Sequence, residues 1–251
     1  MISRKGEREV FVTGLDTTER LLEVSVRLGR QVTLATSPVR VQVLVETRPV
    51  ARSVSGPPVD LRLVLDRSES MSGSVGHGED QSKLKAAKDA AVALLGELTS
   101  LDRAMLVSFN DNHEVHVPRA YVKKRTRARF IRELEGIVPR GSTFISGGLA
   151  HALEERAEMT ELSRVLLFTD GQSWPNKDID HAELIDLADR ARNLQVPLLI
   201  YGTGPDYDWH LLKQLAVRAG HGSYLKHVMD VRELREHMLG ELAYLRGTAI
   251  D

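Results

Sequence analysis

One short stretch of the chain carries oxygen side chains at alternate positions, directly after an apolar run of strand length. The run at residues 61–65 leads into Asp66, and the hydroxyls of Ser68 and Ser70 follow at every second position. A carboxylate and two evenly spaced hydroxyls at a strand end are the oxygen ligands that hard cations such as Mg²⁺ take. Since Mg²⁺ usually keeps several waters, a few such groups are enough to hold it.

Two distant segments strengthen this interpretation, because the first pattern alone fits an ordinary turn. Asp and Ser are common turn and cap residues, so Asp66 and its serines could simply satisfy backbone amides. Far along the chain, however, Thr143 stands just before a helical stretch, in Gly-Ser-Thr. Asp170 follows another apolar strand, at residues 165–168, in Thr-Asp-Gly. Three strand or loop ends therefore each offer an oxygen side chain.

Together these motifs resemble the von Willebrand factor A (VWA) domains, called I domains in integrins, of a bacterial type. In that family a metal-ion-dependent adhesion site (MIDAS) combines an Asp-x-Ser-x-Ser loop with a distant Thr and a distant Asp in Thr-Asp-Gly. The resemblance covers about residues 59–247 and implies a site for Mg²⁺, or for Mn²⁺ or Ca²⁺. The matching residues are Asp66, Ser68, Ser70, Thr143 and Asp170.

The resemblance also implies how these groups act. In the family the serines and, in the ligand-bound state, the threonine touch the metal, while the acids often act through water or as hydrogen-bond partners. Neutral hydroxyls offset little of the charge of the cation, so an anionic oxygen is expected at its open position. The expected partner is a protein that supplies an Asp or Glu.

The sequence departs from the family pattern around both loops. Glu69 stands where many members have Gly, and its side chain could crowd the loop, add a further acid or repel an acidic partner. Ser142 and Phe144 replace the Gly and Asn that commonly flank the threonine. These departures keep a further interpretation open, a VWA scaffold whose metal site has decayed.

The elements that must position the motifs alternate along the chain from about residue 59. Strands and helices of this length predict an α/β fold, a doubly wound, mostly parallel sheet with helices on both faces, Rossmann-like as in VWA domains. Ligands of such sheets bind beyond the carboxyl ends of the strands, where the strand order reverses. Asp66 and Asp170 fall at two such ends. The expected strands are 61–65, 104–109, 115–122, 165–168, 196–201 and 223–228, and the expected helices are 84–98, 126–137, 146–158, 184–191, 208–219 and 231–246.

The N-terminal residues have a different pattern. Apolar and polar residues alternate at 22–28 and 39–45, and 32–35 could add a short strand, which predicts a small antiparallel β segment. Prolines and a glycine end this pattern at 53–58. We therefore expect a β segment over residues 1–55 and a VWA domain over residues 56–251.

Composition narrows the partners and the compartment. The 34 basic and 35 acidic residues nearly cancel, which gives no support for nucleic acid or an anionic membrane as the main partner. There is no cysteine, so disulfides and thiolate metal sites are excluded. No signal-peptide pattern or long apolar run is evident, and we expect a cytoplasmic protein. The sequence leaves the oligomeric state and the identity of the partner open.

The expected function is a metal-dependent protein-interaction module, not an enzyme. The main alternative is a Mg²⁺-dependent phosphatase or hydrolase, since haloacid-dehalogenase-like phosphatases also present an Asp at the end of an apolar strand. Those enzymes need a second carboxylate two residues on, where this chain has Ser68. No Gly-x-Ser-x-Gly elbow of a serine hydrolase occurs either.

Two aromatic residues near the motifs are candidate anchors for a partner. Trp174 follows the Thr-Asp-Gly motif and Phe144 follows Thr143, although core packing is a slightly safer interpretation of a tryptophan. In I domains, binding of an acidic ligand is coupled to movement of the last helix. The resemblance gives that role here to the helix expected at 231–246.

Overall fold

The computed structural model describes residues 57–76, 80–154, 162–172, 180–205, 207–220 and 222–247, and the backbone of residues 22–28, 43–49 and 177–179. Its contacts divide the chain into two units, residues 57–245 and residues 1–56 with 246–251. Trp174 lies outside the described residues.

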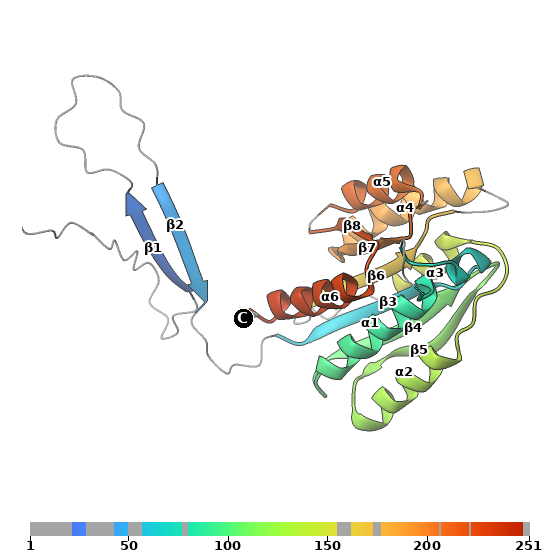
Figure 1. Cartoon of the computed structure of the whole chain (residues 1–251), viewed down its shortest axis with the longest axis horizontal. Coiled ribbons are helices and arrows are strands. Elements are labelled where there is room, and N and C mark those ends of the chain that lie inside the picture. Colours follow the sequence, from blue (N-terminus) through green and yellow to red (C-terminus); the bar gives the residue numbers. More distant parts are fainter. Residues whose placement is uncertain are drawn as a thin grey trace, which may run out of the picture. The chain divides into compact units, whose positions relative to one another are not determined.

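The described residues of the first 56 form an antiparallel strand pair (Figure 1). Strand β1 (Leu22–Leu28) pairs along its whole length with β2 (Val43–Pro49). The predicted antiparallel segment is therefore confirmed, with its second strand later along the chain than the alternation at 39–45 indicated. The short strand predicted at 32–35 lies outside the described residues.

In the described part of the larger unit, a six-stranded sheet has the order β5-β4-β3-β6-β7-β8. Strand β5 runs antiparallel to β4 at one edge, and every other neighbouring pair is parallel. The predicted doubly wound, mostly parallel sheet is confirmed. The strands are β3 (Val59–Asp66), β4 (Arg103–Phe109), β5 (His113–Tyr121), β6 (Leu162–Thr169), β7 (Leu198–Thr203) and β8 (Tyr224–Val228).

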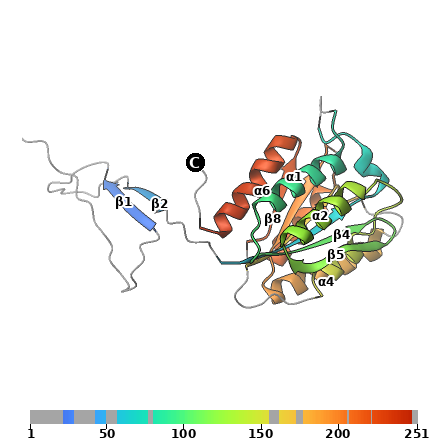
Figure 2. The same ribbon diagram turned by 90° about the horizontal axis from the view of Figure 1, so that it is seen from below.

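Helices cover both faces of this sheet (Figures 1 and 2). One face packs against α1 (Lys83–Glu97), α2 (Lys124–Gly136) and α6 (Val231–Leu245). The other packs against α3 (Ile145–Ala152), α4 (Lys177–Leu194) and α5 (Trp209–Ala219). Helix α3 ends earlier than the predicted 158, and residues 155–160 lie outside the described ones. Among the described helices, none combines the length and apolar character needed to cross a membrane.

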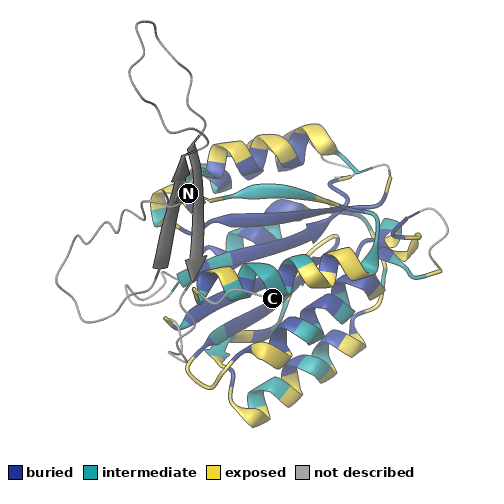
Figure 3. Ribbon diagram, turned by 60° about the vertical axis from the view of Figure 1, so that its left-hand side comes forward, coloured by how far each residue is buried: buried dark blue, intermediate teal, exposed yellow. Residues whose placement is uncertain are grey.

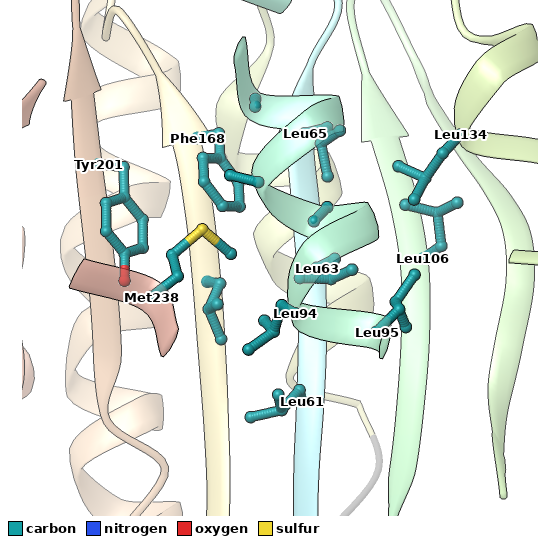
Figure 4. Packing of buried hydrophobic residues seen from close by; sticks show 14 of the residues in the cluster. Leu61, Leu63, Leu65, Leu94, Leu95, Leu106, Leu134, Phe168, Tyr201 and Met238 are labelled. Carbon is teal, nitrogen blue, oxygen red and sulfur yellow. The ribbon is translucent and has the colours of Figure 1, made fainter. Parts of the chain in front are cut away.

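The central strand β3 is buried along its whole length, as the dark strands inside the sheet in Figure 3 illustrate. Its leucines point to one face, where Leu63 and Leu65 pack with Leu94 of α1 and Met238 of α6 (Figure 4). Val64 points to the opposite face and joins the other core cluster. Each fully buried leucine contributes about 2 kcal/mol, so this strand is a rigid base for the loop that follows it.

The strand order also locates the ligand crevice. From β3 the chain crosses first to β4 on one side and later to β6 on the other. The crevice of an open α/β sheet lies where the strand order reverses in this way, beyond the carboxyl ends of the two strands. Those ends are Asp66 in β3 and Thr169 in β6.

Candidate metal centre

The loop after β3 brings the first group of predicted ligands together. Asp66 is fully buried, and its Oδ1 accepts a hydrogen bond of 2.8 Å from the backbone N–H of Ser68. The hydroxyl oxygens of Ser68 and Ser70 lie 3.0 Å apart. Ser70 belongs to a short 3₁₀ helix, η1 (Glu69–Ser72), which turns the chain back toward the strand end. One carboxylate and two hydroxyls therefore meet at one place.

The neighbouring strand β6 supplies the second acid and a link to the first. The hydroxyl of Thr169 donates to Asp66 Oδ2 at 2.6 Å and accepts from the backbone N–H of Gly171 at 2.9 Å. Asp170 is fully buried, and its carbonyl oxygen accepts from the backbone N–H of Asp208 at 2.8 Å. Asp208 caps α5, so the position of Asp170 is fixed from both sides.

The loop that carries Thr143 is joined to the serine loop through its backbone. The N–H of Glu69 donates to the carbonyl oxygen of Gly141 at 3.1 Å, and the N–H of Arg140 donates to that of Arg67 at 2.7 Å. Thr143 itself is 5% exposed. The structure thus places the Thr143 loop beside the loop of Ser68 and Ser70, as the motifs predicted.

A glycine is needed at the turn before Thr143. Gly141 has a φ of +75°, and a Cβ on it would lie 2.3 Å from Oδ2 of Asp111. The same aspartate uses Oδ1 to accept from the backbone N–H of Ser142 at 2.9 Å. Asp111 therefore holds this loop from outside the site, a role that the sequence patterns did not indicate.

Two of the three departures from the family pattern, Glu69 and Phe144, do not disturb the loops. Glu69 is exposed at the start of η1, so its side chain does not crowd the buried carboxylate and hydroxyls. Its charge nevertheless lies at the rim, where it would face an approaching partner. Phe144 is half-buried just before α3 and lies near Gly147, where a Cβ would come 3.2 Å from its ring.

The electrostatics of the site are dominated by two buried acids on adjacent strands. Burial and, after it, the negative charge of Asp170 raise the pKa of Asp66 to about 7, against the hydrogen bonds from Ser68 and Thr169 that lower it. Two carboxylates held close together in a low-dielectric environment favour a cation between or beside them.

One cation of the chain already lies at this place, and the sequence patterns missed it. Lys83 is 7% exposed, and its Nζ lies 2.9 Å from Oδ2 of Asp170. It is the first residue of α1, after the cap Ser82. A positive charge at a helix N-terminus is unfavourable, because it lies at the positive end of the helix dipole. A lysine at this position therefore indicates that an acidic side chain lies nearby and stabilises it. The contact joins residues far apart in the sequence, and no local pattern identifies which acid that is.

The donor set fits a hard divalent cation. It consists of oxygen atoms from two buried carboxylates and the hydroxyls of Ser68, Ser70 and Thr143, the ligand type that Mg²⁺ and Mn²⁺ accept. Throughout the described residues, no three His, Cys, Asp or Glu side chains gather as a metal-binding group. A centre here would therefore depend on its hydroxyls and on water as much as on its acids.

A cavity of about 300 Å³ adjoins the two loops. It is lined by two guanidinium groups, two amides and the carboxylate of Asp111. Arg67 in this lining is paired with Glu114 at 2.9 Å, whereas Arg140 is exposed. The lining residues are Arg67, Asn110, Asp111, Asn112, Arg140 and Gly141.

Comparisons with known proteins agree with this architecture. The family model of the von Willebrand factor type A domain matches residues 61–172. BatB from Bacteroides thetaiotaomicron aligns over 74% of this chain and 98% of its own, with a TM-score of 0.60 and 14% identity. The von Willebrand factor type A protein from Catenulispora acidiphila aligns over 91% of this chain and 50% of its own, with a TM-score of 0.65 and 17% identity.

The larger unit, residues 57–245, has a VWA fold. A search of the curated proteins found no match. Proximal thread matrix protein 1 from the mussel byssus, solved with a zinc-occupied MIDAS motif, also shares the fold of the VWA domain described here. It aligns over 74% of this chain and 45% of its own, with a TM-score of 0.57 and 19% identity. At these identities the structural likenesses show the fold alone.

Proposed function

We propose that the VWA domain is a metal-dependent protein-interaction module that binds an acidic group of a partner protein. The observation that carries the proposal is the meeting of Asp66, Ser68, Ser70 and Asp170 at the carboxyl ends of β3 and β6, where the sheet order reverses. The proposed ligands of Mg²⁺ or Mn²⁺ are these four residues and Thr143, and Ca²⁺ is the remaining candidate.

The residues of the chain have separate tasks in this proposal. Ser68, Ser70 and Thr143 offer neutral oxygens, while Asp66 is held in place by Thr169. When bound, the cation supplies a positive charge that hydroxyls offset poorly, which favours an anionic oxygen from outside. The VWA domain of the mussel byssus protein, which carries zinc at its MIDAS, supports a divalent metal in this kind of site.

The surface around the site supports an acidic partner. Arg140 is exposed at the cavity beside the Thr143 loop, whereas Arg67 in the same cavity is already paired with Glu114. Glu69, exposed beside the serines, would repel further acidic groups of the partner that come near it. We therefore expect the additional acidic groups of the partner to lie near Arg140. Phe144 and Trp174 are proposed as apolar anchors.

Metal binding can be tested with a matched pair of serine variants. Added Mg²⁺ or Mn²⁺ should raise the melting temperature of the wild-type protein, because a ligand that binds only the folded state stabilises it. Ser70→Ala should reduce this rise. Ser72→Ala should keep it, since the Ser72 hydroxyl lies in the same short helix but donates to the carbonyl of Glu69 and is exposed. Equal responses of all three proteins would contradict the site.

Partner binding needs its own experiment. Proteins captured from the source cell by the wild-type domain in Mg²⁺ should be released by chelator and should not be captured by Thr143→Ala. A partner that binds at full strength in chelator would show that the metal centre is not the docking place. We also propose that the protein is not an enzyme and that it is located in the cytoplasm. The lack of cysteine is in keeping with a reducing compartment.

A second candidate function is favoured by one observation. The ion pair between Lys83 and Asp170 gives the buried acid a counterion from the chain itself, as a scaffold with no metal would need. Such a scaffold would hold its partner through other surfaces. The thermal experiment with the serine variants separates the two candidates, because a scaffold without metal shows no response to Mg²⁺ or Mn²⁺.

A further inference from the structure

The ion pair of Lys83 has a consequence for the metal centre that the family resemblance does not contain. We propose that the Lys83 ammonium and a divalent cation are alternative counterions for Asp170, so that Lys83 weakens metal binding and keeps the metal-free site folded. This inference rests on the proposed metal centre and specifies how metal binding there is regulated. When the divalent cation binds, it replaces the Lys83 ammonium as the counterion of Asp170.

The geometry shows that the contact is built into the fold. The Lys83 side chain is 9% exposed and the Asp170 side chain is fully buried, with 2.9 Å between Nζ and Oδ2. The backbone N–H of Lys83 donates to the carbonyl oxygen of Gly73 at 2.8 Å, which fixes the start of α1 beside the serine loop. Lys83 therefore approaches the acids from the side of the same loop that carries Ser68 and Ser70.

A glycine leaves room for the lysine side chain. Gly204, after β7, has a φ of +88°, and a Cβ on it would lie 2.4 Å from Cε and 3.0 Å from Nζ of Lys83. Any other residue would press on the end of the lysine. Gly204, directly after β7, therefore leaves space for the end of the lysine side chain that contacts Asp170.

The charges near the site explain why two cations would compete. Asp66 and Asp170 are the buried acids, and Lys83 is the buried cation in contact with one of them. Arg67, next to Asp66 in the sequence, is paired with Glu114 instead. A divalent ion at the hydroxyls would meet the ammonium across a short distance in a poorly screened environment, where repulsion between like charges is strong. A bound metal ion must therefore either displace the ammonium of Lys83 from Asp170 or bind with an affinity that the repulsion lowers.

The same reasoning predicts opposite effects of a neutral substitution with and without metal. Lys83→Met keeps most of the side-chain volume but removes the charge. In chelator the variant should melt at a lower temperature than the wild-type protein, because Asp170 is left buried without a counterion. With saturating Mn²⁺ this difference should shrink or reverse. The dissociation constant for Mn²⁺ should fall by at least about tenfold.

The control is another lysine of the same helix. Lys85 is exposed and forms an ion pair with Asp89 in the next turn. Lys85→Met removes the same charge from the chain, so it corrects for the change in net charge. It should alter neither the affinity for Mn²⁺ nor the response of the melting temperature. Mn²⁺ affinity is measured by calorimetric titration of the whole chain.

The outcomes distinguish this inference from the metal centre itself. If wild type and Lys83→Met bind Mn²⁺ equally, Lys83 is only a structural residue and the inference is wrong, while the metal centre stands. If only Lys83→Met binds Mn²⁺, the inference is supported, and the wild-type domain is a scaffold with a lysine in place of the metal. If neither binds, both proposals fall. Should Lys83→Met fold poorly in chelator, recovery in Mn²⁺ supports the inference, and equal instability in both conditions overturns it.

Discussion

The buried carboxyl of Asp66 should make the stability of the metal-free protein depend on pH in a direction opposite to that of a paired surface acid. Its pKa is raised from 3.8 to about 7 in the folded state, first by burial and then by the charge of Asp170. The folded protein therefore binds this proton more tightly than the unfolded chain does. The contribution of Asp66 to the free energy of unfolding is therefore largest at low pH, and it is lost as the pH rises from about 4 through about 7.

The size of this loss follows from the two pKa values. A rise from 3.8 to about 7 corresponds to about 4 kcal/mol of free energy of unfolding when the carboxyl is fully ionised. Between pH 5 and pH 8 the linkage relation gives a loss of about 2.5 kcal/mol from this one group. Asp66→Asn carries no ionisable group at that position, so this part of the pH dependence should be absent.

The assay is urea denaturation in chelator at several pH values. The difference in free energy of unfolding between wild type and Asp66→Asn should grow by about 2.5 kcal/mol in favour of the variant from pH 5 to pH 8. Asp102→Asn is the control, because it neutralises a buried acid that accepts from Val59 at the opposite end of β3. Parallel pH curves for wild type and Asp66→Asn would refute the raised pKa, and saturating Mg²⁺ should remove the difference between their slopes.

Three further predictions concern other parts of the VWA domain. The purified protein should not turn over a generic phosphate ester, because Ser68 stands where a phosphatase needs its second carboxylate; turnover that disappears in Asp66→Asn would contradict this. Gly141→Ala should lower the free energy of unfolding by about 1–2 kcal/mol in thermal denaturation, because Gly141 has a positive φ, and it should weaken metal binding. Gly136→Ala is the control: a Cβ there meets open space, so neither effect is expected. Arg62→Met should destabilise the fold by about 3 kcal/mol in urea, with partial recovery on adding Asp60→Asn.

The outline of the fold was predictable because its signals are local. The apolar run of β3 and the alternation of strands with helices depend on neighbours in the sequence, and they led directly to the sheet and to the carboxyl ends that carry Asp66 and Asp170. Loop residues of a known motif are equally local. The same reasoning gave helix α3 too long, since apolar periodicity does not mark where the C-cap Leu153 ends it.

Contacts between distant segments were not predictable in this way. Arg62 is fully buried within β3, where it pairs with Asp60 at 3.0 Å and donates to the carbonyl oxygen of Ala152 at 2.6 Å. The sequence pattern gave no sign of this, since it treated residues 61–65 simply as an apolar run. Lys83 and Asp170 are a second example, since their pairing depends on the β3–β6 arrangement and on the start of α1. Both ion pairs become visible only when the chain is folded.

The movement of the last helix that the VWA resemblance implies has a short physical route in this structure. Gly76, in the segment that follows the serine loop, lies so close to Met229, two residues before α6, that a Cβ on it would be 2.1 Å from the carbonyl oxygen of Met229. Met71, from η1, is fully buried in the same core cluster as Met238 of α6. These contacts join the serine loop and the segment after it to the start of α6 and to its packed face, so a shift of the loop would be felt at α6. Because coupling between two sites is reciprocal, any ligand that favours one loop position must favour one α6 position by the same free energy.

Lys83 belongs to this route as well, because it begins α1, the helix beside α6. Release of Lys83 from Asp170 on metal binding would free the start of α1.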